Sequence, residues 1–96
     1  MPSELLQQIE LAASRGEPAP PDLQPPEIML YHMLTGLYAT YHAGRLPKSQ
    51  GRERKQQIYS VYSKLAAEYK QFTDICAEYQ RQLRDGYTVG DKQIIP

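Results

Sequence analysis

An uninterrupted apolar heptad between Ser49 and Asp85 constrains this chain more than any other feature of its sequence. Its members follow one another at alternating steps of four and three residues: Ile58, Tyr62, Leu65, Tyr69, Phe72, Cys76, Tyr79 and Leu83. This spacing places them in one seam along one side of a long helix. The seam has to be covered by another part of the chain or by a binding partner.

The sequence predicts an all-α fold of three helices, over about residues 3–15, 26–43 and 49–85. Ser3 is a suitable N-cap for the first helix, and Gly16 suits the left-handed position after its last turn. The second helix opens on a Pro-Pro-Glu sequence that includes Pro26, and it stops at Gly44. Ser49 is the expected N-cap of the third helix.

The connections predict a helical hairpin with one overlong arm. Residues 17–26 hold five of the eight prolines and form an extended connector, whereas residues 44–48 form a short turn that makes the second and third helices antiparallel. The second helix carries so many apolar residues that we expect contacts on two of its sides. Being about half as long, it covers the third helix only as far as Leu65 or Tyr69.

Beyond that point the seam has no assured cover. The first helix could fold back over it, a second copy or another protein could bind it, or the long helix could break near Gln71–Asp74. If a second copy binds, the self-association seam consists of Phe72, Ile75, Cys76, Tyr79 and Leu83. We expect residues 86–96 to leave the helix as an extended tail.

Length and composition narrow the class of protein. The 96 residues form one small domain, residues 1–96, and its eleven basic and eleven acidic side chains cancel. A single cysteine excludes an internal disulfide, no apolar run reaches the ~18 residues of a membrane span, and the first residues do not resemble a signal peptide. These features predict a cytoplasmic protein that does not bind membranes.

The sequence shows no pattern of catalytic, cofactor-binding or metal-binding residues. The six glycines do not have the spacing of a nucleotide-binding loop, and two histidines and one cysteine are too few for a typical zinc site. Cys76 lies within the apolar seam, and no basic residue three or four positions away would lower its pKa. We therefore expect a protein that is not an enzyme and has no cofactor.

Charge and tyrosine content point to binding instead. Residues 1–30 carry five acids against one arginine, whereas residues 45–55 carry five bases against one glutamate. Eight of the nine aromatic residues are tyrosines, which are enriched at protein interfaces together with arginine. The predicted partner-binding residues are a basic group and an exposed tyrosine rim beside it: Arg45, Lys48, Arg52, Arg54, Lys55, Tyr31, Tyr38 and Tyr59.

Residues 25–58 also resemble a group of natural proteins. A Pro-Pro-Glu sequence opens a helix rich in tyrosine and leucine, Ala-Gly-Arg follows it, and Gly-Arg-Glu-Arg-Lys-Gln-Gln-Ile opens the next helix. This arrangement resembles short proteins of prophages and mobile elements in gut Firmicutes. The resemblance implies an accessory protein that inhibits a host defence complex, of the anti-CRISPR type, in the cytoplasm of the host cell.

Three functions are therefore open at the level of sequence. The first is a protein-binding module that inhibits a host protein or complex by covering part of its surface. The second is a nucleic-acid-binding accessory protein, in which the basic segment 45–55 contacts phosphates. The third is a structural helical subunit that associates with itself, as a homodimer, through the seam.

Overall fold

The computed structural model describes residues 3–84, which form three helices and no strand. Helix α1 spans Glu4–Arg15, α2 spans Pro25–His42 and α3 spans Lys48–Arg84. The all-α prediction is confirmed, and each predicted boundary within these residues agrees to within one residue. The predicted tail, residues 86–96, lies outside the described residues.

Local sequence explains most of the helix ends. The Leu6 N–H donates to Ser3 Oγ at 3.2 Å, so the predicted N-cap of α1 is confirmed. Gly16 adopts the predicted left-handed conformation (φ 68°), and the N–H of Glu17 donates to the carbonyl of Ala12 at 2.9 Å. At the start of α2, the Gln24 N–H donates to the Glu27 carboxylate at 2.9 Å.

The predicted cap of α3 is wrong by two residues, because the cap position is Pro47 and not Ser49. The helix begins at Lys48, and the Pro47 carbonyl accepts the hydrogen bond from the Gly51 N–H at 2.9 Å. Ser49 therefore lies inside the first turn rather than at the cap. Leu46 stabilises the turn before α3, because its side chain is buried and lies against Gly51.

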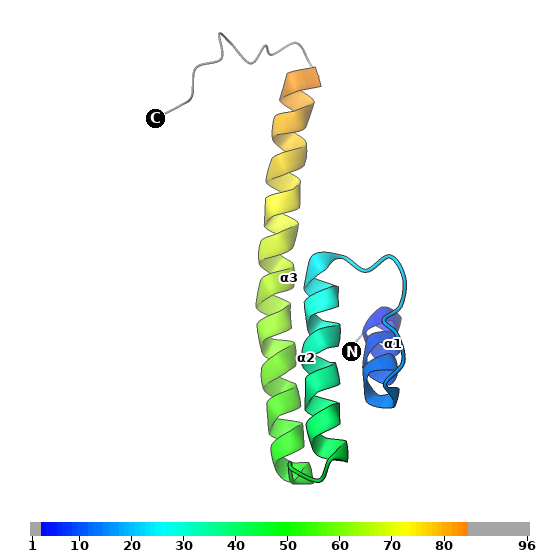
Figure 1. Cartoon of the computed structure of the whole chain (residues 1–96). Helices are drawn as coiled ribbons and strands as arrows, with labels where there is room; N and C mark the ends of the chain where they lie inside the picture. Colours follow the sequence, from blue (N-terminus) through cyan, green and yellow to red (C-terminus); the bar gives the residue numbers. More distant parts are fainter. Residues whose placement is uncertain (1–2, 85–96) are drawn as a thin grey trace, which may run out of the picture.

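Helix α2 lies between the other two helices (Figure 1). Its Leu30 and Leu34 are fully buried and join Ile9 and Ala13 of α1 in the core. From the opposite side, Ile58, Tyr59 and Tyr62 of α3 pack against the same cluster. The expected contacts on two sides of the second helix are thus present, and they explain why its apolar residues are spread so widely around it.

The connector returns α1 to α2 and does not bring it to the far half of α3. Leu23, near the end of the connector, packs against the core, and Asp22 beside it has a positive φ of 62°. Figure 1 shows α1 level with the middle of α2, well away from the distal end of α3. The first helix therefore leaves residues 72–83 uncovered.

Candidate functional site

Glu10 is the centre of the most connected polar cluster in the described structure. Its carboxylate accepts hydrogen bonds from the Tyr59 hydroxyl (2.7 Å) and the Tyr38 hydroxyl (2.8 Å), and Lys55 Nζ lies 3.0 Å away. These three donors come from α2 and α3, so one acid of α1 ties all three helices together.

Burial and hydrogen bonding in this cluster shift the pKa values of its acid and its two tyrosines. Burial alone would raise the pKa of Glu10, but the hydrogen bonds from Tyr59, Tyr38 and Lys55 outweigh it and lower the pKa below 4.5. Burial, followed by the hydrogen bond to Glu10, raises the pKa of Tyr38 to about 12 and also raises that of Tyr59. With raised pKa values, both tyrosine hydroxyls stay protonated at neutral pH and donate to Glu10. The four residues Glu10, Tyr38, Lys55 and Tyr59 join the three helices and are called the clasp below.

Two further polar contacts hold α1 and the residue after its cap against α2. The Tyr31 hydroxyl donates to the Glu17 carbonyl, and His42 Nε2 lies 3.1 Å from the Ser14 carbonyl. Three tyrosines that the sequence analysis places on an exposed rim, Tyr31, Tyr38 and Tyr59, are therefore partly buried. The expectation of an exposed rim is wrong, because their hydroxyls are used within the fold.

The basic segment does not form one surface. Lys48, Arg52 and Lys55 line a groove of about 190 Å³, together with Leu37, Tyr38, Tyr41 and Gly51. Arg54 lies in a different depression, beside Met33 and Val61, and Arg45 is exposed in the turn. Residues 52 and 54 separate because a step of two positions turns about 200° around a helix.

Within this groove, only part of the positive charge is free for a ligand. Lys55 is paired with Glu10, whereas Lys48 and Arg52 make no salt bridge to any of the described residues. Tyr41 contributes a 38 % exposed ring at the same place. The groove therefore offers two cations beside an aromatic and aliphatic surface, and it is suited to an anionic group attached to an apolar one.

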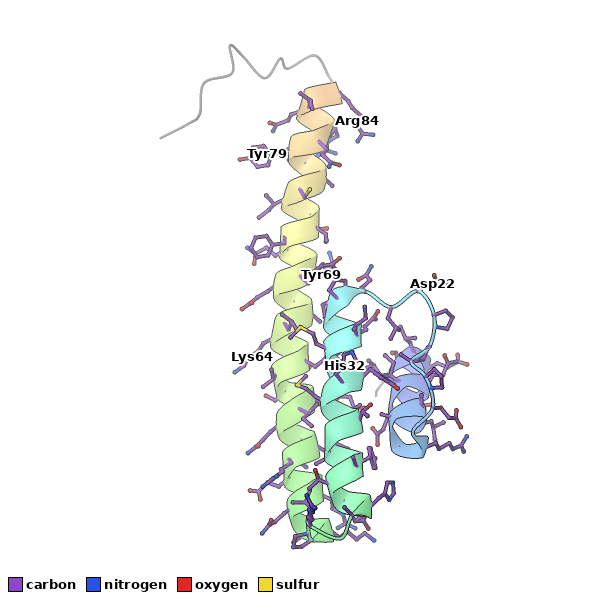
Figure 2. The ribbon with its side chains drawn as sticks, in the orientation of Figure 1. Asp22, His32, Lys64, Tyr69, Tyr79 and Arg84 are labelled. Carbon is purple, nitrogen blue, oxygen red and sulfur yellow. The ribbon has the colours of Figure 1, made fainter. Side chains whose placement is uncertain are left out.

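The distal part of α3, residues 70–84, is the second candidate and is called the arm below. Seen in Figure 1, it continues well past the N-terminal end of α2. Figure 2 shows Tyr69 level with that end of α2, and Tyr79 projecting from the arm with no other helix beside it. The last partly buried seam residue before the arm is Tyr69, as the length difference between the helices predicts.

All five predicted seam residues of the arm are exposed. Phe72 is 74 % exposed, Tyr79 68 %, Leu83 51 % and Ile75 48 %, and Cys76 is an exposed free thiol. The helix does not break at Gln71–Asp74. Thr73 donates its hydroxyl to the Lys70 carbonyl at 2.8 Å, which satisfies this polar side chain within the helix. Lys70 pairs with Asp74 at 2.9 Å, and a pair at this spacing favours helical conformation.

Glu10 is the residue that sequence reasoning missed. It follows Ile9 on the apolar stripe of α1, where a single acid has no distinctive sequence signature. Its partners Tyr38, Lys55 and Tyr59 lie 28, 45 and 49 positions away. Only the return of α1 onto α2 brings them together.

The described residues contain neither a metal-binding cluster nor a membrane-spanning helix. Among residues 3–84 there is no group of three or more histidine, cysteine or acidic side chains that could hold a metal ion. Within the same range, no helix combines the length and apolar character that crossing a membrane requires.

Comparisons of the chain with family models, with curated proteins and with solved structures find no match.

Proposed function

We propose that the protein is a non-enzymatic protein-binding module that works through the arm of α3. The observation that carries the proposal is the row of Phe72, Ile75, Tyr79 and Leu83, all about half exposed or more, on a part of α3 that has no neighbouring helix among residues 3–84. Contiguous apolar patches of this kind mark interaction sites on soluble proteins. An isolated helix face with apolar residues at heptad spacing is suited to binding another helix.

Contacts along the arm also support this role. Lys70 pairs with Asp74, and Arg81 pairs with Glu78, so most of its charged side chains are already satisfied along the helix. These pairs favour helical conformation in a segment that has no neighbouring helix among residues 3–84 (Figure 1). The arm is therefore presented as a preformed helix, which reduces the entropy lost on binding.

Capture experiments test the arm directly. A tagged chain carrying Phe72→Glu and Tyr79→Glu is expected to lose the proteins that the wild-type chain retains from a lysate of the cells that encode it. Introduced carboxylates would have to be buried in an apolar contact, which is unfavourable. The control is Leu11→Glu, because Leu11 is an exposed apolar residue (51 %) on α1, outside the arm.

The result is read by mass spectrometry of the retained proteins, including an untagged copy of the chain itself. Circular dichroism confirms that each variant is folded. If the arm variant and the Leu11→Glu variant retain the same proteins as the wild type, the arm is not the binding surface.

A second candidate function follows from the groove. Lys48 and Arg52 lie beside the exposed ring of Tyr41, and this combination favours an acidic surface of a partner protein. In this proposal the protein inhibits a host complex, as the resemblance to prophage proteins implies, by covering that acidic surface. Nucleic acid is the alternative ligand, since phosphates would be attracted by the same two cations.

Charge reversal separates these possibilities. Lys48→Glu with Arg52→Glu is expected to abolish binding of an acidic partner, whereas Arg54→Glu with Lys64→Glu changes net charge equally and leaves the groove intact. Retention of a labelled duplex DNA or single-stranded RNA at low salt, falling steeply at moderate salt, would identify nucleic acid as the ligand. Equal behaviour of the two double variants would exclude the groove as the binding site.

A further inference from the structure

We infer that the partner of the arm is a second copy of this chain, and that the two arms pair in antiparallel orientation as a homodimer. The inference rests on the proposed function, in which the arm is the interaction surface. It adds the identity of the occupant and the direction in which the two helices run.

Charge is distributed unevenly around the arm. In the heptad that places Phe72 and Tyr79 at d and Cys76 and Leu83 at a, the flanking e and g positions are Thr73, Ile75, Gln80 and Gln82. All of these flanking residues are uncharged. Complexes of different coiled-coil chains are commonly selected by opposite charges at e and g, whereas this arm carries no charge there that would select a foreign helix or repel a copy of itself.

The charged residues of the arm lie on the other side of the helix. Lys70, Asp74, Glu78, Arg81 and Arg84 occupy the b, c and f positions of the same heptad. Two opposite-charge pairs form within the helix, Lys70 with Asp74 and Arg81 with Glu78. An uncharged, apolar face backed by charges that are paired within their own helix is complementary to an identical face.

The arm continues the heptad through which α3 already contacts α2. Ile58, Tyr62 and Leu65 belong to the same heptad as the arm, and they are partly buried on the side of α3 that meets α2. The heptad spacing continues unchanged into the arm, which extends past the N-terminal end of α2 (Figure 1). Figure 2 shows Tyr79 on the side of α3 that faces away from α2. A helix that pairs with the arm would therefore cover the continuation of the seam without meeting α2.

The position of α2 also decides the orientation. Two parallel α3 helices would run side by side along their whole length, but the space beside Ile58, Tyr62 and Leu65 is occupied by α2. In an antiparallel pair the overlap is limited to residues 70–84, about 22 Å of helix. The parts of the two chains that contain α1 and α2 then extend in opposite directions, away from each other. The N-terminal end of α2, at Pro25, then marks the end of each overlap.

Antiparallel pairing also gives matched layers. In this orientation, residues at the a positions of one helix face residues at the d positions of the other. Leu83 would pack on Phe72 of the second copy, and Cys76 on Tyr79 of the second copy, with the same two layers repeated by the two-fold axis. Each large aromatic ring is thereby placed opposite a smaller side chain, which allows the two faces to interdigitate.

Sedimentation of the purified full chain tests whether the dimer exists. We expect a monomer–dimer equilibrium over the micromolar range, and a dissociation constant raised about 100-fold or more by Phe72→Glu with Tyr79→Glu. Leu11→Glu should leave the constant within about threefold of the wild type, as an exposed substitution outside the interface. A monomer at high micromolar concentration, or a dimer unaffected by the arm substitutions, overturns the inference.

The orientation of the two arms is measured as the distance between two spin labels, one on each chain, at Glu53→Cys near the N-terminal end of α3. Cys76→Ala removes the native thiol. Antiparallel arms place the two labels about 75 Å apart, whereas parallel arms place them within about 40 Å. The shorter distance overturns the antiparallel arrangement. If the chain is monomeric but retains other proteins through the arm, only the dimer inference fails; if the arm also retains no other protein, the proposed function fails with it.

Discussion

Leu34→Ala is expected to lower the free energy of unfolding by about 3 kcal/mol, and the melting temperature by about 10–20 °C. Leu34 is fully buried in the middle of α2, in the cluster that contacts both α1 and α3. The substitution removes apolar contacts on two sides at once and leaves a cavity that neither neighbouring helix can easily fill. A small domain whose total stability is about 5–10 kcal/mol would lose a large part of it.

The measurement is urea and thermal unfolding followed by circular dichroism at protein concentrations that keep the association state constant. Leu11→Ala is the matched control, because Leu11 is 51 % exposed and the same atoms are removed. Its effect should stay within about 0.5 kcal/mol. If the two variants unfold alike, α2 is not the central helix of the fold.

Glu10→Ala is expected to lower the free energy of unfolding by about 2–3 kcal/mol. Two tyrosine hydroxyls and the Lys55 ammonium would lose their shared acceptor between the three helices. The carboxylate is only partly screened by water, since 27 % of its side chain is exposed. Glu17→Ala is the control: its carboxylate is 57 % exposed and makes one long contact, to Arg15 at 4.0 Å.

Hydrogen exchange should show where the stability is lost. In the Glu10→Ala chain, we expect the amides of α1 to exchange faster than those of α2, because α1 is short and depends on this clasp for its attachment. Uniformly faster exchange in all three helices would instead mean that α1 does not detach by itself. No change in stability would contradict the clasp.

The same carboxylate makes stability depend on pH in a defined direction. The pKa of Glu10 is lowered in the folded state, so its stabilisation is fully present above about pH 4.5 and is lost as the pH falls through the folded-state pKa. The difference in unfolding free energy between the wild type and Glu10→Gln should therefore shrink below about pH 4.5. A difference that stays constant down to about pH 3 would contradict this assignment.

At alkaline pH the two tyrosines have the opposite effect: the free energy of unfolding should fall as the pH rises. The pKa of Tyr38 is raised from 10.0 to about 12, so its contribution is present below about pH 10 and is lost as the pH rises toward 12. Tyr59 acts in the same direction, because its pKa is also raised.

The sequence by itself determined the elements of this protein. Heptad spacing in α3, the Ser3 cap and Gly16 are local signals, and each acts through hydrogen bonds or side-chain positions within a few residues of the chain. The point near Tyr69 where α2 stops covering α3 was also predictable, because helix length is proportional to residue number and α2 is about half as long as α3. Whether α1 covers the arm was left open by the sequence, and the packing of α1 on α2 decided it. Among the local signals, the cap of α3 was misplaced: the Pro47 carbonyl, and not Ser49, accepts the hydrogen bond from the Gly51 N–H.

Only the tertiary structure decided which side chains are free to bind. Tyr38, Tyr59 and Lys55 were predicted to form a recognition surface, but their polar groups contact Glu10 once α1 packs on α2. Arg52 and Arg54 are neighbours in sequence but lie in different depressions. Contacts across 28 to 49 positions depend on how whole helices are packed, and local sequence patterns contain no information about that packing.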